Sequence, residues 1–356
     1  MGSSHGMDAR AVHFVGSFPA ESTSIAMRAM LDRAGPRLRT LPTGETRRYE
    51  FYIQPILADL VSQGVLEVKR LGGWRSSRDR TIHRVPRGAE LTGAMMDLGY
   101  LRETEEALPI FERLRREREL PDLALQIGMP TDFTLSFIAM GVSGARTYRK
   151  AFAEATAHEM TAIRDVAGDD VVLQLEATAE LILMAKTQPF HRLVDAAFGL
   201  GKGIATLASS APAGTRVGVH LCLGSLRNKA RATLRDARPL VDLANSIVRQ
   251  WPPGRTLEYL HGPFAAGDMP PSTNADFYAP LEELALGEGT DFYAGLVHDS
   301  PTEAQQLQTL RLLEEALGRS VDGVASACGL GRRPRPVADV LMARADALAA
   351  AVSSDE

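Results

Sequence analysis

The sequence contains little cysteine, with only Cys222 and Cys328 in 356 residues. Two cysteines can form one disulfide at most, so the fold cannot depend on a disulfide framework. No apolar run approaches the roughly 18 residues that a membrane-spanning helix needs, and no signal-peptide pattern opens the chain. These absences favour a reduced, cytoplasmic protein that does not enter a membrane.

The sequence also lacks a strong charge of either sign. Its formal net charge is −4 at pH 7, with acidic and basic residues mixed along the chain. Neither a nucleic acid nor an anionic membrane is therefore expected as a partner. The segment Gly201-Lys202-Gly203 is too short a match to indicate a phosphate-binding P-loop.

Apolar runs and amphipathic stretches alternate along the rest of the chain. Residues 1–6 have the composition of an expression-tag remnant, so the expected domain is a single one over 7–356. Short apolar runs are typical of buried parallel strands. The predicted strands cover 11–15, 66–71 (or alternatively 81–85), 123–127, 171–176, 216–221, 256–261, 292–297 and 321–325. The predicted helices cover 101–120, 148–166, 237–249, 303–317 and 337–351.

This alternation predicts the fold class. Strands that alternate with helices over the whole chain favour an α/β fold of the (β/α)8 TIM-barrel type. The stretches 71–90 and 264–274 break the alternation and are rich in loop-forming residues. Long loops in such a barrel often cover the active site.

Metal-ligand residues gather at the ends of predicted strands, where barrel active sites lie. His220 and Cys222 end the fifth strand and Cys328 ends the eighth. A spacing of two in a strand points His220 and Cys222 to the same side, where both could bind one zinc ion at roughly 2.1 and 2.3 Å. The alternative is a hydrogen-bonded buried histidine beside two small core cysteines.

The sixth predicted strand offers two further metal ligands. His261 ends this strand and Glu258 lies three residues earlier, on the opposite side by alternation. A regular strand can present only one of them to the metal. His261 is preferred because it lies nearer the barrel mouth, with Glu258 as the alternative.

Other strand ends carry candidates for proton transfer. His298 follows the seventh strand and could relay a proton, with Asp299 fixing its tautomer or acting itself. A hydrogen-bonded strand-end histidine is an equal alternative. Glu176 ends the fourth strand, where it could hold a substrate amine, act as a base or remain a solvated loop carboxylate.

Substrate-binding candidates lie in two glycine-containing turns and one further strand. The backbone amides of Gly16 and Ser17, after the first strand, could meet a substrate carboxylate. Arg47 and Arg48 could grip an anion through their guanidinium groups, and a solvated helix start is the alternative for them. Gln126, in the third strand, is expected to face the same active-site pocket as these two turns.

Taken together, these motifs resemble the catalytic half of cobalamin-independent methionine synthase and its smaller single-barrel relatives, in the superfamily that includes uroporphyrinogen decarboxylase. The resemblance implies a zinc site at His220, Cys222 and Cys328. It also implies a substrate-binding acid at Glu176 and catalytic roles in the His298–Asp299 segment. The stretches that carry the resemblance are His13-Phe-Val-Gly16-Ser17-Phe-Pro, Gln174-Leu-Glu176, Val219-His220-Leu-Cys222, Gly295-Leu-Val-His298-Asp299-Ser-Pro and Ala327-Cys328-Gly329-Leu330.

The chain departs from the family at two points of the site. The family has a glutamate zinc ligand at the end of the sixth strand, where this chain reads Glu258-Tyr-Leu-His261. The acid at Glu176 is longer than the aspartate of the family. The resemblance covers the catalytic half alone, so homocysteine and methyl-folate do not carry over to this chain.

The predicted function is zinc-dependent transfer of an alkyl group, such as methyl, to or from a thiol, with a zinc-bound thiolate as nucleophile. The expected partners are a small-molecule thiol and an alkyl donor or acceptor, and a homo-oligomer is compatible with the sequence. On the same site, the alternatives are addition of a thiol to an epoxide or other electrophile, and C–S bond cleavage. Two alternatives come from other classes: a metal-free lyase of the uroporphyrinogen-decarboxylase type and a non-catalytic zinc-binding barrel.

Overall fold

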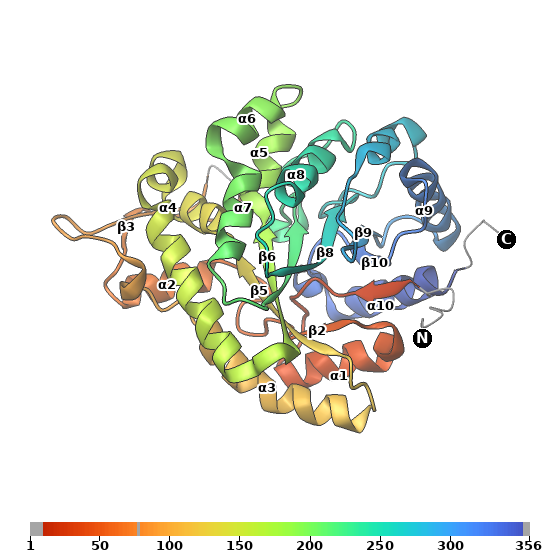
Figure 1. The fold of residues 1–356 in the computed structure, drawn as a ribbon, viewed down its shortest axis with the longest axis horizontal. Coiled ribbons are helices and arrows are strands. Elements are labelled where there is room, and N and C mark those ends of the chain that lie inside the picture. The colour runs from red at the N-terminus through yellow and green to blue at the C-terminus, as the bar shows by residue number, and fades with distance from the viewer. Residues whose placement is uncertain (1–9, 77–78, 352–356) are drawn as a thin grey trace.

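Eight parallel strands curl into a nearly closed barrel that is surrounded by helices (Figure 1). The computed structural model describes residues 10–76 and 79–351, so the expected tag remnant at 1–6 lies outside the described residues. The barrel strands are β1 (Ala11–His13), β2 (Thr40–Pro42), β5 (Ala124–Pro130), β6 (Val171–Ala177), β7 (Arg216–Leu221), β8 (Thr256–Pro263), β9 (Asp291–Val297) and β10 (Gly323–Ser326). They pair in the order β1-β10-β9-β8-β7-β6-β5-β2, and a parallel bridge between Val12 and Leu38 links the two ends of this order. The predicted (β/α)8 TIM barrel is confirmed.

The prediction for the second barrel strand is wrong. Residues 66–71 and their alternative 81–85 contain β3 (Glu67–Arg70) and β4 (Ile82–Arg84), which form an antiparallel pair outside the barrel. The β-branched residues of this pair read as a buried strand, but Val68 is 40% exposed. The true second strand, β2, has three residues and ends in Pro42. That is too short for a hydrophobic period to be recognised.

The other predicted strands and the predicted helices are present; the strand at 216–221 and the helix at 303–317 have the predicted ends, and the others have shifted ends. The helix predicted at 148–166 is the second part of a longer helix that bends at Gly141, where φ is +75°. Within the described ranges, no helix is both long and apolar enough to span a membrane. The helices are α1 (Thr23–Ala34), α2 (Gln54–Ser62), α3 (Tyr100–Glu117), α4 (Asp132–Ala167), α5 (Thr178–Lys186), α6 (His191–Phe198), α7 (Leu200–Ser209), α8 (Arg238–Val248), α9 (Glu303–Leu317) and α10 (Arg335–Ala350).

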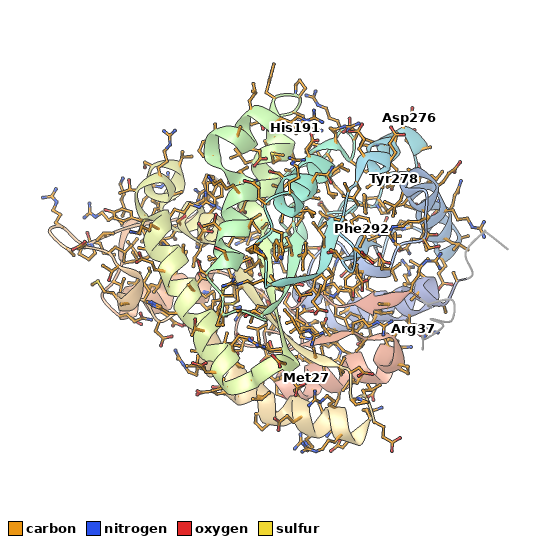
Figure 2. The ribbon with its side chains drawn as sticks, in the orientation of Figure 1. Met27, Arg37, His191, Asp276, Tyr278 and Phe292 are labelled. Carbon is orange, nitrogen blue, oxygen red and sulfur yellow. The ribbon has the colours of Figure 1, made fainter. Side chains whose placement is uncertain are left out.

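Apolar side chains fill the space between the strands and the helices. Met27 of α1 and Phe292 of β9, for example, are both fully buried (Figure 2). Inside the barrel, polar side chains join the packing. The Tyr259 hydroxyl donates to Gln174 Oε1 at 3.0 Å, and Gln174 Nε2 donates to the Val15 carbonyl at 2.7 Å. This network holds the turn after β1, which borders the site described next.

Candidate functional site

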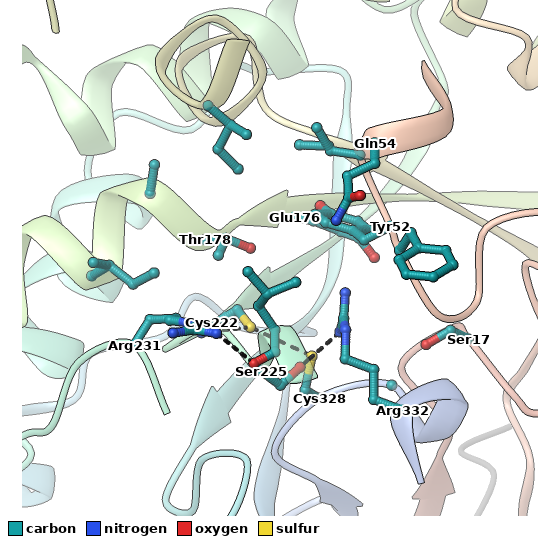
Figure 3. Close-up of a pocket in the computed structure, with 18 of the residues that line it drawn as sticks. Ser17, Tyr52, Gln54, Glu176, Thr178, Cys222, Ser225, Arg231, Cys328 and Arg332 are labelled. Carbon is teal, nitrogen blue, oxygen red and sulfur yellow. Dashed lines mark hydrogen bonds between the residues drawn. The ribbon is translucent and has the colours of Figure 1, made fainter. Parts of the chain in front are cut away.

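Three metal-ligand side chains converge at the carboxyl end of the barrel. His220 lies near the end of β7, Cys222 directly follows this strand, and Cys328 lies just after β10. One ligand atom from each lies within 4.8 Å of the others. The two sulfur atoms are 3.6 Å apart and form no disulfide (Figure 3). One imidazole nitrogen and two thiolates are ligands that zinc prefers, and three protein ligands are typical of catalytic zinc sites, so the donor set fits zinc.

Hydrogen bonds around the two sulfur atoms favour a negative charge on Cys328. A hydrogen bond from the Cys222 thiol, together with His220, holds the pKa of Cys328 well below its usual range. The same contact and burial raise the pKa of Cys222. The Ser225 hydroxyl donates to Cys328 Sγ at 3.1 Å, and the Gly224 amide donates to Cys222 Sγ at 3.3 Å. Because metals bind the thiolate form of cysteine, this arrangement prepares Cys328 for ligation.

His261, the predicted further ligand, lies behind His220 and outside the group of three. Its Nδ1 is 2.7 Å from Nδ1 of His220, and its Nε2 is 3.1 Å from the Ser326 carbonyl oxygen. Burial, together with the neighbouring His220 and His13, holds the pKa of His261 well below its usual range. A neutral ring with both nitrogens engaged is placed to orient His220 rather than to bind a metal itself.

The predicted alternative to His261 lies at the other end of the barrel. The Glu258 carboxylate accepts a hydrogen bond of 2.6 Å from Arg216, the first residue of β7. His220 is at the opposite end of that strand. The structure therefore separates Glu258 from the cysteines.

Two buried carboxylates face the metal-ligand group from other strands. The register of β6 and β7 places Glu176 beside His220, and Glu45 follows β2. A Cβ atom on Gly128 would lie 2.8 Å from Oε1 of Glu176 and 3.0 Å from Oε1 of Glu45, so the two carboxylates meet over this glycine. Burial raises the pKa of Glu45 to about 8, despite the nearby Arg48. Since Glu45 Oε1 and Glu176 Oε2 have no hydrogen-bond partner, the pair can share a proton or bind a cationic group.

The turn after β1 borders the cavity that opens from the metal-ligand group, whereas Arg47, Arg48 and Gln126 do not line this cavity. Ser17 does line this cavity, and Gly16 packs directly against the Glu45 carboxylate. Arg47 is exposed outside it.

Arg48 is buried. Its guanidinium donates to Glu103 and, at 3.0 Å, to the Gly128 carbonyl. Gln126 lies inside the barrel, where Nε2 donates to the Val15 carbonyl at 2.8 Å. Arg48 and Gln126 therefore support the walls of the site and have no direct access to a ligand.

His298 and Asp299, the predicted proton-transfer pair, belong to a separate network. Arg333 donates to Asp299 Oδ2 at 2.8 Å. The Ser300 amide donates to His298 Nδ1 at 3.1 Å, which leaves the proton on Nε2, 3.1 Å from the Gly267 carbonyl. Neither residue lines the cavity that opens from the metal-ligand group, so the structure favours the strand-end hydrogen-bonding alternative for His298.

A cavity of about 290 Å³ opens from the metal-ligand group. At this end, Figure 3 shows Tyr52 and Gln54 beside Glu176, and the charged Arg80 and Lys186 lie among the apolar walls. A mostly apolar cavity with a few polar groups is typical of small-molecule sites. Its apolar walls come from α4, α5 and the loops after β2 and β3, and include Phe51, Trp74, Phe137, Ile138, Ile182 and Leu183.

Sequence interpretation missed five charged residues that line this cavity: Glu45, Arg80, Lys186, Arg231 and Arg332. Glu45 lies three residues beyond β2. If residues 40–42 had been recognised as a strand, the segment Gly44-Glu45 would have been assigned to the active-site face. Arg231 and Arg332 lie in loops that follow β7 and β10, and no spacing in the sequence marks them.

Two solved structures share this fold over nearly the whole chain. A B12-independent methionine synthase from Shewanella sp. W3-18-1, in complex with selenomethionine, is 13% identical to this chain with a TM-score of 0.57, and the match covers 96% of this chain and 95% of that one. A methyltransferase from Methanosarcina mazei is 17% identical with a TM-score of 0.53, and the match covers 96% of this chain and 95% of that one. No family model and no curated protein sequence matches the chain. At these identities the likeness shows the barrel fold, and the chemistry depends on the residues of the site.

Proposed function

We propose that this protein is a zinc-dependent transferase that moves an alkyl group, such as methyl, to or from the sulfur of a small-molecule thiol. The observation that carries the proposal is the convergence of His220, Cys222 and Cys328 within 4.8 Å. This group lies at the mouth of a barrel and opens on a cavity of about 290 Å³. The fold shared with a methionine synthase and a methyltransferase supports the same class of chemistry.

The three side chains would hold the metal and leave a place for substrate. Because Nδ1 of His220 faces His261, Nε2 is the nitrogen left for zinc. When bound, zinc supplies a Lewis acid that lowers the pKa of a coordinated substrate thiol and favours the thiolate nucleophile at neutral pH. Catalytic zinc sites commonly use three protein ligands for this reason.

The facing carboxylates would position substrate and supply a proton. Glu176 is placed to hold a substrate amine beside the metal-ligand group. Glu45, with a pKa of about 8, is protonated at neutral pH and can donate its proton to a leaving group. The apolar walls would exclude water from the reacting sulfur.

Metal analysis tests the proposal. Purified wild type is expected to contain one zinc per chain, whereas C222S, C328S and H220Q are expected to lose most of it, because each removes one of three ligands. The matched control is H158Q, which alters an exposed histidine and should keep its zinc. Wild type without zinc, or ligand variants that retain all of it, would contradict the proposal.

Thiol alkylation by the zinc-loaded protein is the second part of the test. Transfer of a methyl group to or from a small thiol should depend on zinc and should be lost in the three ligand variants. The assay is run in both directions, because C–S cleavage and reaction with an epoxide would use the same site. Full zinc occupancy without any reaction in either direction would favour a non-catalytic zinc-binding barrel.

A second candidate is a metal-free lyase that acts on carboxylated substrates. It is favoured by Arg231 and Arg332, which line the cavity, since guanidinium groups bind carboxylates well. The two candidates differ in one measurable property. Activity of this second kind would persist after removal of zinc with a chelator, whereas thiol alkylation would not.

A further inference from the structure

The anion-binding role that the sequence suggested for Arg47 and Arg48 fits two other arginines. Arg48 is buried between carboxylates, with Glu103 as its main partner, whereas Arg231 and Arg332 line the cavity at its metal-ligand end. On the basis of the proposed function, we propose that Arg231 and Arg332 bind an anionic group of the thiol substrate. The substrate class is then a small thiol that carries a carboxylate or a sulfonate.

The charge of Arg332 acts on the Cys328 thiolate, whose pKa it helps to lower, but neither arginine is neutralised by a carboxylate of the described residues. In the described part of the chain, neither side chain has a carboxylate within ion-pair distance, and the Nε atoms of both are buried without a hydrogen-bond partner. Burial and the positive charges of Arg332 and Arg227 lower the pKa of Arg231, with only partial compensation by Asp268. An anion between the two guanidinium groups would relieve this repulsion and supply the missing hydrogen-bond acceptors.

The position of the arginines limits the size of the substrate. Arg332 Nη1 donates to Ser225 Oγ at 2.8 Å, and Ser225 Oγ donates to Cys328 Sγ at 3.1 Å. Figure 3 shows Arg231 and Arg332 on either side of Ser225 and Cys328. Two consecutive hydrogen bonds therefore separate the Arg332 guanidinium from the metal-ligand group. A thiol that reaches both must be compact, with a short spacer between its sulfur and its anionic group.

The remaining space of the cavity lies along the apolar walls. Trp74, Phe137 and Ile182 line this part, and the charged Arg80 and Lys186 lie among them. This part leaves room for the carrier of the alkyl group. The end of the site beside Arg231 and Arg332 thus selects the thiol, and the rest of the cavity accommodates its reaction partner.

Thiol binding to the cobalt(II)-substituted protein tests this inference, because a cobalt–thiolate bond gives an absorption band without any turnover. Wild type is expected to bind 3-mercaptopropionate or 2-mercaptoethanesulfonate about tenfold more tightly than neutral 2-mercaptoethanol, a difference of about 1.4 kcal/mol. The carboxylate and sulfonate arms show which anion the site prefers. Both R231Q and R332Q should bring this ratio close to one and leave the affinity for 2-mercaptoethanol nearly unchanged.

Matched variants separate anion binding from a general disturbance. R332K keeps the charge and should retain part of the preference, and R116Q alters an exposed arginine outside the cavity lining and should retain nearly all of it. Because the two tested arginines lie in different loops, a folding defect in one variant leaves the other as a test. Equal affinity of wild type for anionic and neutral thiols, or an unchanged ratio in R231Q and R332Q, would overturn the anion site alone. Absence of the band with every thiol would overturn the proposed function and this inference with it.

Discussion

Single side chains determine which nitrogen of His220 is available to a metal. The contact of 2.7 Å between the Nδ1 atoms of His220 and His261 engages one side of the ligand ring. The Ser326 carbonyl, 3.1 Å from His261 Nε2, fixes the second histidine in turn. Outer partners of this kind orient metal-bound histidines and raise metal affinity without touching the metal. His261 is therefore a positioning residue whose effect should appear in affinity rather than in stoichiometry.

We predict that H261A lowers zinc affinity by about 10- to 100-fold, as loss of an outer-shell partner typically does. Full occupancy should still be reached at excess zinc, because the three ligands remain. Competition with a chromophoric chelator measures the affinity, and H158A serves as the control for loss of an exposed histidine. Loss of stoichiometry at saturating zinc would instead make His261 a ligand, as the sequence suggested.

A second residue-scale prediction concerns the protonated form of Glu45. Burial raises its pKa to about 8, so the acid holds its proton at neutral pH and loses it as the pH rises through 8. If it donates that proton, wild-type turnover should fall above about pH 8. E45Q should lose activity by roughly 10²- to 10⁴-fold, the usual contribution of general acid catalysis. Rate profiles from pH 6 to 10 measure this, with the exposed Glu50 changed to Gln as control. Undiminished turnover at pH 9.5 would exclude Glu45 as the donor.

At the scale of elements, Glu180 connects the starts of two helices that border the site. Its buried carboxylate accepts hydrogen bonds from Thr131, the residue that caps α4, and from Thr134 Oγ1 at 2.7 Å. Thr134 Oγ1 in turn accepts from the Ala179 amide at 2.9 Å, near the start of α5. This contact fixes α4 relative to α5, and both helices supply apolar walls of the cavity.

Burial raises the pKa of Glu180 to about 7 from an ordinary value of 4.5, which makes folding stability depend on pH. Between these values the folded state holds a proton that the unfolded state has lost. This group's contribution to the free energy of unfolding is therefore complete below pH 4.5 and is lost as the pH rises through 7, by up to about 3 kcal/mol.

We expect E180Q to lack this pH-dependent contribution to the free energy of unfolding. Relative to wild type, E180Q should become more stable by up to about 3 kcal/mol as the pH rises from 5 to 8. Urea denaturation at a series of pH values measures the difference, and E288Q, at an exposed position, should follow wild type. Parallel curves for E180Q and wild type would show that Glu180 does not titrate in this range.

At the scale of the whole molecule, the sequence was sufficient for the barrel but not for all of its site. Buried parallel strands such as 171–176 and 216–221 are largely apolar runs, so these strands and their alternation with helices could be recognised in the sequence. The three residues of β2 were too few to be recognised as a strand. Because another segment was taken as the second strand, Glu45 was left out of the predicted site. His298 follows a strand, as the sequence predicts, but its side chain turns toward Gly267 and away from the cavity. Spacing identifies the active-site face of a barrel, whereas side-chain direction within a loop depends on tertiary contacts.

The metal-ligand group should also affect the stability of the barrel as a whole. Its ligands come from β7 and β10, which are separated in the sheet by β8 and β9, so a bound metal connects distant parts of the chain. Binding to the folded state alone adds about 4 kcal/mol when free zinc is 1,000 times its dissociation constant. In a chain of this size, about 1 kcal/mol shifts Tm by a little over 1 °C, so removal of zinc should lower Tm by several degrees. Calorimetry with and without a chelator measures this, and C222S should show almost no zinc-dependent shift. If wild type and C222S melt at the same temperature in excess zinc, the metal does not bind through Cys222 in the folded protein.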